Sequence, residues 1–224
     1  MATERPGGRH VATGGTTLAG SGSGPPAAPD AGTARTEALV GLLLVGLVLL
    51  AALWFRSHPA AVFLDRWGTW LFPPDPSGSA WRDIADLKML PIFIGGSILA
   101  AAFVVRRDPR RALACLVAPS VAVLLAEYLV KPLIARRFGG ALFFPSGTTT
   151  AVGSLAMAWA IAVPRPLRTP VAAVGAVLAG LECAAVTALQ WHLPTDALGG
   201  VLLGVGTVLV FDGVLHVRHA PRGA

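Results

Sequence analysis

The stretch FFPSGTTTAVGSLAMAWAIAV, Phe143 to Val163, decides the fold that we expect for this chain. From Gly147 onward it contains no charged residue, and nearly every side chain is apolar or small. A run of this length and composition is typical of a helix that crosses a membrane. Its many small residues favour close packing against other helices. The Pro-Ser-Gly turn before the run marks the start of that helix.

The rest of the chain follows the same pattern. Of its 224 residues, 54% are hydrophobic and only 13% are charged, whereas soluble domains carry about a quarter charged residues. The apolar residues form runs that are too long and unbroken for a soluble core. We therefore predict an all-α, polytopic membrane bundle with six spans. These spans are 38–55, 89–105, 112–130, 147–163, 171–190 and 196–217.

The N-terminal 36 residues differ from the rest, because they are rich in Gly, Ala, Thr, Ser and Pro and have almost no large apolar side chains. Such a segment buries too little apolar surface to offset chain entropy. We therefore predict a disordered cytoplasmic tail over 1–36, a six-span domain over 37–217 and a short cytoplasmic tail over 218–224. The first apolar run begins too late for a typical cleaved signal peptide, so we expect it to be retained as a span.

The arginines predict how the bundle is oriented. They gather in the loops 106–111 and 164–170 and in both tails. An even number of spans places all of these segments on one side, which the positive-inside rule assigns to the cytoplasm. We therefore expect a multi-pass plasma-membrane protein with both termini in the cytoplasm. This bias also explains the net charge of +6 without a nucleic-acid partner.

Two segments on the opposite, outer side have unusual patterns. AAVFLDRWGTWLF, residues 60–72, is short and amphipathic and carries Trp67 and Trp70, which favours an interfacial helix along the outer leaflet. The loop 131–146 contains three cations although outer loops are usually poor in them. An ordinary exposed loop or contacts with lipid headgroups would explain these charges, and so would an anion site.

Polar residues that suit phosphate binding lie in three stretches on this outer face. The stretches are LVKPLIARRFGG (129–140), FFPSGTTTA (143–151) and LQWHLPTDALGG (189–200). Lys131 supplies a point charge, and Arg136 and Arg137 supply planar donors for phosphate oxygens. Ser146 and Gly147 lie at a helix N-terminus, where free N–H groups and the helix dipole favour an anion.

His192 and Asp196 are the candidate catalytic pair. They are four residues apart and share a helix face if the helix begins early. An aspartate can fix the tautomer of an imidazole and leave the other ring nitrogen free as a nucleophile. Glu127 precedes Lys131 by four residues and is expected to pair with it in a supporting role. Taken singly, these residues also fit an interfacial histidine and an ordinary charge at a helix N-terminus.

The order of a basic motif, a Pro-Ser-Gly motif and then His and Asp resembles the type 2 phosphatidic acid phosphatase superfamily. This superfamily includes lipid phosphate phosphatases and vanadium haloperoxidases, and the resemblance covers residues 129–200. It implies hydrolysis of lipid phosphates or pyrophosphates on the outer face, without a metal or other cofactor. It further implies that His192 attacks phosphorus to form a phosphohistidine, in the setting of cell-envelope lipid carrier recycling.

The chain departs from the family's pattern at functional positions. Phe138 and Gly139 stand where the first motif has Arg-Pro, and Ala185 and Val186 stand where the third motif has Ser-Arg. Thr148 replaces the histidine that protonates the leaving group. Thr148 can donate a hydrogen bond to phosphate but cannot act as a general acid, and losing general acid catalysis costs about 10²- to 10⁴-fold.

These departures leave two functional interpretations open. A phosphate that leaves from a pyrophosphate is less basic than an alkoxide and needs the missing proton less. The first interpretation is therefore a phosphatase that prefers lipid pyrophosphates, such as a polyprenyl diphosphate, over phosphatidic acid. The alternative is a degenerate member that binds lipid phosphate without turnover, as a scaffold, sensor or lipid-handling protein. A small transporter is disfavoured, because its spans should carry more buried polar residues.

Overall fold

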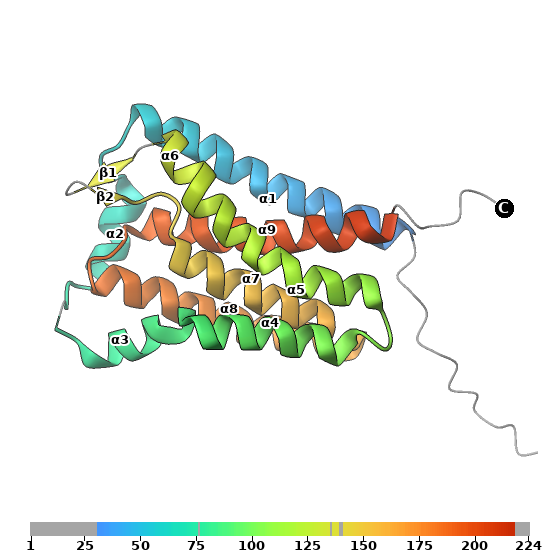
Figure 1. Cartoon of the computed structure of the whole chain (residues 1–224). Coiled ribbons are helices and arrows are strands. Elements are labelled where there is room, and N and C mark those ends of the chain that lie inside the picture. Colours follow the sequence, from blue (N-terminus) through green and yellow to red (C-terminus); the bar gives the residue numbers. More distant parts are fainter. Residues whose placement is uncertain (1–30, 76, 135, 139–140, 218–224) are drawn as a thin grey trace, which may run out of the picture.

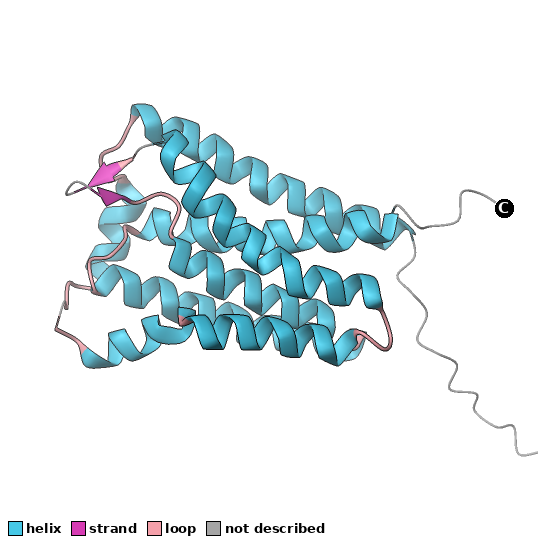
Figure 2. Ribbon diagram, in the orientation of Figure 1, coloured by secondary structure: helices cyan, strands magenta, loops and turns pink. Residues whose placement is uncertain are grey.

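The computed structural model shows a bundle of long helices that run side by side (Figure 1). The structure describes residues 31–217, apart from residues 76, 135, 139 and 140. The parts of the predicted tails at 1–30 and 218–224 lie outside the described residues. In Figure 2 nearly all of the described chain is helical, with two short strands at one end of the bundle.

The helices have the following bounds. They are α1 (Ala31–Ser57), α2 (Phe63–Leu71), α3 (Ser79–Ala85), α4 (Leu90–Val104), α5 (Pro109–Leu124), α6 (Lys131–Ile134), α7 (Gly147–Ala162), α8 (Arg165–Ala188) and α9 (Pro194–Val217). A 3-10 turn, η1 (Asp86–Lys88), follows α3, and a π-helical turn, η2 (Leu125–Val130), joins α5 to α6. The strands β1 (Arg137–Phe138) and β2 (Ala141–Leu142) pair antiparallel, with Arg137 opposite Leu142.

The prediction of a helical membrane protein is confirmed. Among the described residues, four helical segments are long and apolar enough to cross a membrane: α1, α5 continued to Ile134, α8 and α9. A fifth span results if the bent pair of Ser79–Lys88 and Leu90–Val104 counts as one crossing. With 16 residues, α7 is shorter than these segments. The structure thus shows four to five candidate spans. The sixth span stays a prediction.

The first helix begins earlier than the predicted tail boundary, so residues 31–36 are helical. Here α1 lies directly against α9. A side chain at Gly213 of α9 would come within 2.6 Å of the carbonyl oxygen of Ala34, which is fully buried. Small residues on both helices allow this close approach. Packing against a distant helix therefore orders a segment whose own composition favours disorder.

The central helix α7 packs against α4, α5, α8 and α9. Glycines of α9 let the two backbones approach, since a Cβ atom at Gly204 would lie 2.5 Å from the carbonyl oxygen of Thr150. The hydroxyl of Thr149 donates to the carbonyl oxygen of Ala197 on α9 at 2.8 Å. These contacts fix the start of α7 relative to the start of α9.

The bundle has two distinct ends (Figure 1). We call the end with α2, β1 and β2 the strand end, and the end where α1 begins and α9 finishes the tail end. The predicted amphipathic stretch at the strand end forms the helix α2. Its Trp67 and Trp70 are exposed, whereas its Asp65 is buried. The placement of α2 along a membrane surface stays a prediction.

Candidate active site

The ion pair predicted from four-residue spacing is present at the strand end. Nζ of Lys131 lies 2.6 Å from Oε1 of Glu127. The Lys131 side chain is 11% exposed, so most of it is shielded from solvent. Glu127 lies within the π-helical turn η2, and such turns are frequent at functional sites.

The Pro-Ser-Gly turn ends in a capped helix start, as the sequence predicts. The N–H of Thr149 donates to Oγ of Ser146 at 3.4 Å, and the N–H of Ser146 donates to the backbone oxygen of Asp196 at 2.9 Å. The N–H groups of Gly147 and Thr148 have no hydrogen-bond partner within the described part of the chain. Free donors at a helix N-terminus make a site for an anion.

In the structure, the carboxylate of Glu127 occupies the space at this helix start. A Cβ atom added to Gly147 would clash with Oε1 of Glu127, so glycine is the residue that leaves room for the carboxylate. Negative charge is stabilised there by the dipole of α7 and by Lys131. Glu127 thus stands where an anionic ligand would sit.

The candidate nucleophile, His192, lies in the turn between α8 and α9, next to the same site. Its ring meets that of Phe143 edge to face, with centroids 5.5 Å apart. The imidazole hydrogen-bonds to the backbone of Phe143, while its buried Nδ1 has no partner among the described residues. Burial, with a smaller contribution from the charge of Lys131, lowers the pKa of His192 to about 3. A neutral imidazole that donates through one nitrogen keeps a lone pair on the other.

Arg136, a predicted phosphate ligand, is buried and saturated with hydrogen bonds. Its guanidinium carries five N–H groups and meets five acceptors from three segments. They are the carbonyl oxygens of Pro59 (3.1 Å) and Ala60 (3.3 Å), Oγ1 of Thr195 (3.0 Å), Oδ1 of Asp196 (2.5 Å) and Oδ2 of Asp65 (3.1 Å). The guanidinium also lies over the ring of Phe55 at 3.9 Å. No donor is left for a phosphate, so Arg136 links the α1–α2 loop, α2 and α9.

Asp196, the predicted orienting partner of His192, is engaged elsewhere. Its carboxylate accepts from Arg136 and, at 3.1 Å, from the N–H of Leu193. The physical reason is that α9 begins at Pro194, so His192 precedes the helix and the four-residue spacing does not place the pair on one face. The backbone of Phe143 contacts the imidazole instead.

The other predicted ligands lie at the same end of the bundle. Arg137 is in β1, and Thr148 is the second residue of α7, partly exposed. The hydroxyls of the next two threonines serve the helix: that of Thr149 donates to Ala197, and that of Thr150 donates to Ser146 at 2.7 Å. Thr148 is therefore the one of the three threonines that borders the site.

Sequence reasoning missed Asp65, Thr195 and Phe143. The carboxylate of Asp65 accepts from Arg136 and, at 2.9 Å, from the N–H of Thr195. Asp65 is the only acidic residue in the stretch 60–72, but the adjacent Arg66 offers a local partner, so the sequence alone does not indicate that Asp65 is buried. The sequence does not indicate Phe143 either, because its backbone makes the contact.

A sequence model of the PAP2 superfamily matches residues 127–218. The match begins at Glu127 and includes Lys131, the Pro-Ser-Gly turn and His192. This match covers 92 of the 224 residues and supports membership of the PAP2 superfamily. It confirms the family resemblance and, with the apolar helices, supports a membrane protein with a phosphatase type of reaction. Neither the curated proteins nor the solved structures yield a match to the chain.

Proposed function

We propose that this PAP2-superfamily protein is an integral membrane phosphatase that hydrolyses a lipid diphosphate or lipid phosphate at the strand end. In this proposal α1, α4, α5, α7, α8 and α9 cross the plasma membrane, and both termini are cytoplasmic. The strand end then faces outward, with α2 at the outer interface. The observation that carries the proposal is the neutral imidazole of His192, whose Nδ1 has no described partner, beside Lys131 and the start of α7.

The site residues divide into phosphate ligands and a nucleophile. Lys131 and the N–H groups of Gly147 and Thr148 bind the terminal phosphate, with Arg137 as a further ligand. Nδ1 of His192 attacks phosphorus, and the P–N bond forms as the P–O bond to the lipid phosphate breaks. The bonding electron pair leaves with the lipid phosphate. Water then attacks the phosphohistidine, releases phosphate and restores the imidazole.

Glu127 must yield its place before a phosphate binds, because its carboxylate lies against Gly147. It can do so by rotating away together with Lys131. The substrate preference follows from Thr148, which supplies no acidic proton for a leaving alkoxide. A lipid diphosphate expels a weakly basic phosphate, so we expect faster turnover of a polyprenyl diphosphate than of phosphatidic acid.

A second candidate function is binding of lipid phosphate without turnover. Three observations favour it: Arg136 has no free donor, Thr148 stands at the proton-donor position, and Glu127 occupies the start of α7. In such a protein the same site would retain a lipid headgroup, and the bundle would act as a sensor, a scaffold or a lipid-handling protein.

The two candidates are separated by phosphate release from a polyprenyl diphosphate. We compare the purified wild type with His192→Ala and with the matched control His58→Ala. His58 is an exposed histidine just after α1, also at the strand end, and within the described residues its hydrogen bonds and ring stacking are with Trp54. We expect His192→Ala to abolish release and His58→Ala to retain it, with faster release from the diphosphate than from phosphatidic acid.

The results decide between the candidates as follows. Equal rates for the wild type and His192→Ala would exclude His192 as the nucleophile. Binding of the lipid diphosphate without any release by the wild type would favour the binding protein. Faster release from phosphatidic acid would contradict the proposed preference while leaving the reaction type in place.

A further inference from the structure

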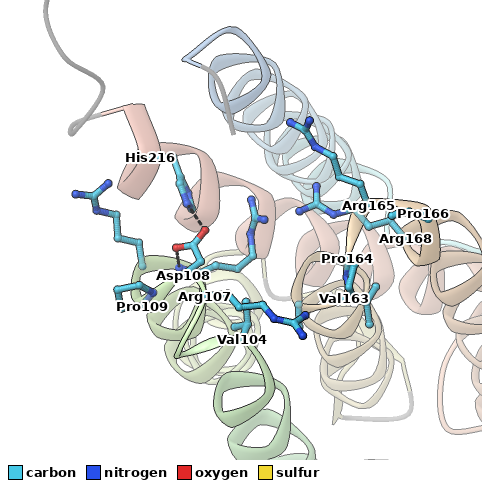
Figure 3. A pocket seen from close by; sticks show the side chains of 13 residues that line it. Val104, Arg107, Asp108, Pro109, Val163, Pro164, Arg165, Pro166, Arg168 and His216 are labelled. Atoms are coloured by element: carbon cyan, nitrogen blue, oxygen red, sulfur yellow. Dashed lines mark hydrogen bonds and ion pairs between the residues drawn. The ribbon is translucent and has the colours of Figure 1, made fainter. Parts of the chain in front are cut away.

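A second polar region lies at the tail end, opposite to His192. A cavity of about 580 Å³ opens there between the starts of α5 and α8 and the ends of α4, α7 and α9 (Figure 3). Its lining is rich in arginines from the α4–α5 loop and the first turns of α5 and α8. They are Arg107, Arg110, Arg111, Arg165 and Arg168. A cavity of this size is within the range that binds small molecules, and its chemistry favours an anion.

Two of these arginines are held by carboxylates. Nη2 of Arg111 lies 2.9 Å from Oδ2 of Asp212, and both side chains are buried. Arg168 lies 3.6 Å from Glu37, but its buried Nε has no hydrogen-bond partner among the described residues. Arg111 thus anchors the wall of the cavity, while the guanidinium of Arg168 is not saturated by the described residues.

The negative charge of Asp108, the acidic residue in the lining, is compensated by hydrogen-bond donors of the protein. Oδ1 of Asp108 accepts from the N–H of Arg111 at 3.0 Å, and Oδ2 accepts from Nε2 of His216 at 2.9 Å (Figure 3). Burial raises the pKa of Asp108, but these two donors outweigh it and lower the pKa overall. Nδ1 of His216 faces the carbonyl oxygen of Asp212 at 2.7 Å. Both ring nitrogens of His216 therefore lie against oxygen atoms of the protein.

The remaining arginines give the cavity a surplus of positive charge. Arg107, Arg110 and Arg165 are exposed and form no ion pair within the described part of the chain. In addition, α8 begins at the cavity with Pro164 as its N-cap and without a side-chain cap. The positive end of its dipole therefore adds to the charge of the guanidinium groups.

We propose that this cavity binds a phosphate group, supplied by the headgroup of an anionic lipid or by free phosphate. Planar guanidinium groups match phosphate oxygens, and basic pockets between membrane helices are known to bind anionic headgroups. The lipid is favoured because apolar surface adjoins the cavity. Arg107 lies 5.6 Å from the ring of Phe103, whose exposure is 48%. The inference does not rest on the proposed function, because the cavity and His192 lie at opposite ends.

The test uses full-length protein in nanodiscs of neutral phosphatidylcholine. One arm adds phosphatidylglycerol and counts bound lipid by native mass spectrometry; the other adds inorganic phosphate and follows the thermal unfolding midpoint. The test variant is the double substitution Arg107→Gln and Arg165→Gln, which breaks no described ion pair. The matched control is Arg35→Gln with Arg106→Gln, which removes the same charge from exposed tail-end positions outside the cavity lining.

We expect the test variant to lose about fivefold in lipid affinity for each arginine removed, and the control to lose much less. A lipid ligand predicts this loss in the phosphatidylglycerol arm alone. A free phosphate ligand predicts that phosphate raises the midpoint of the wild type but not of the test variant. Equal losses in the test and control variants would indicate diffuse surface charge and overturn the proposal, as would binding of neither ligand by the wild type.

Discussion

Two polar clusters lie side by side at the strand end, and they are built in opposite ways. The first, the Arg136 cluster, consists of Asp65, Arg136, Thr195 and Asp196. The second, the His192 niche, consists of Glu127, Lys131, Gly147, Thr148 and His192. Every N–H of the guanidinium in the Arg136 cluster has an acceptor, whereas the His192 niche leaves a ring nitrogen and two backbone N–H groups unpaired among the described residues.

The difference distinguishes polar groups that are paired within the protein from polar groups that are available to a ligand. Buried polar groups in proteins are nearly always paired, so a saturated cluster needs nothing more, whereas the unpaired groups of the His192 niche are the ones that a phosphate would meet in the proposed function. The tail end follows the same division, since Arg111 is paired while Arg107 and Arg165 are open. The sequence shows how many cations are present, and the structure shows which of them are available.

The largest effect that we expect comes from Arg136→Gln. The substitution leaves the carboxylates of Asp65 and Asp196 buried without their counter-charge. Removing one partner of a buried ion pair costs about 3–5 kcal/mol. We therefore expect a much lower midpoint of thermal or denaturant unfolding for the purified protein.

Arg66→Gln is the control for this prediction, because Arg66 is exposed on α2 next to the buried Asp65. Its effect on the free energy of unfolding should stay within about 0.5 kcal/mol. If Arg136→Gln kept normal stability and lost only phosphate affinity, Arg136 would be a ligand, and the contrast between the two clusters would break down.

The next effect concerns the close contact between Gly200 of α9 and the start of α7, which fixes the two clusters relative to each other. A Cβ atom at Gly200 of α9 would clash with the backbone oxygen of Ser146 and with Oγ1 of Thr149. Gly200→Ala should therefore push α9 from the start of α7 and destabilise the protein by about 1–3 kcal/mol. The measurement is again the unfolding midpoint, now with affinity for a lipid diphosphate as a second readout.

Gly46→Ala provides the matched control, since a Cβ atom at Gly46 meets nothing within 4 Å. Alanine favours a helix over glycine by about 0.5–1 kcal/mol, so this variant should be equal to the wild type or slightly more stable. Wild-type stability in Gly200→Ala would mean that the start of α7 tolerates movement, and the site would then be less rigid than the structure indicates.

The sequence predicts the local features of the site and misses the distant ones. The pair of Glu127 with Lys131 and the cap by Ser146 depend on spacings of three or four residues, which a helix enforces. By contrast, the partners of Arg136 lie 59 to 77 residues away in the chain. Nothing in the local pattern distinguishes a cation that meets such partners from one that meets a ligand.

The same reasoning applies to the bundle. Apolar runs predict its helices, because each run is long enough to be a helix by itself. The early start of α1 and the breaks around α4 depend on packing between helices that are distant in sequence. The predicted contact between Asp196 and His192 is not formed for a similar reason, because the relative position of the two residues depends on where α9 begins.

A smaller effect should follow from Glu127→Gln, which tests the His192 niche. The substitution removes a negative charge that competes with phosphate at the start of α7, while keeping the size of the side chain. Charges at helix N-termini contribute about 0.3–1 kcal/mol, so we expect a several-fold gain in affinity for pyrophosphate, measured by calorimetry in neutral lipid.

Asp83→Asn is the corresponding control, since Asp83 is an exposed acid on α3 at the same end. It removes one negative charge without touching the niche, and pyrophosphate affinity should change little. Weaker binding of pyrophosphate by Glu127→Gln would show that Glu127 contacts the ligand and does not compete with it.

The smallest effect is an expected absence of titration. With its pKa lowered to about 3 by burial, His192 should stay neutral from pH 8 to pH 5. Its NMR signal, assigned with His192→Ala, should therefore not shift over this range. The unfolded chain takes up a proton on His192 near pH 6.5 and the folded protein does not, so this residue lowers stability as the pH falls from 6.5 towards 3. The stability of the wild type relative to His192→Ala should decline accordingly, whereas a titration midpoint near 6.5 would place His192 in a solvated environment and contradict its burial in the niche.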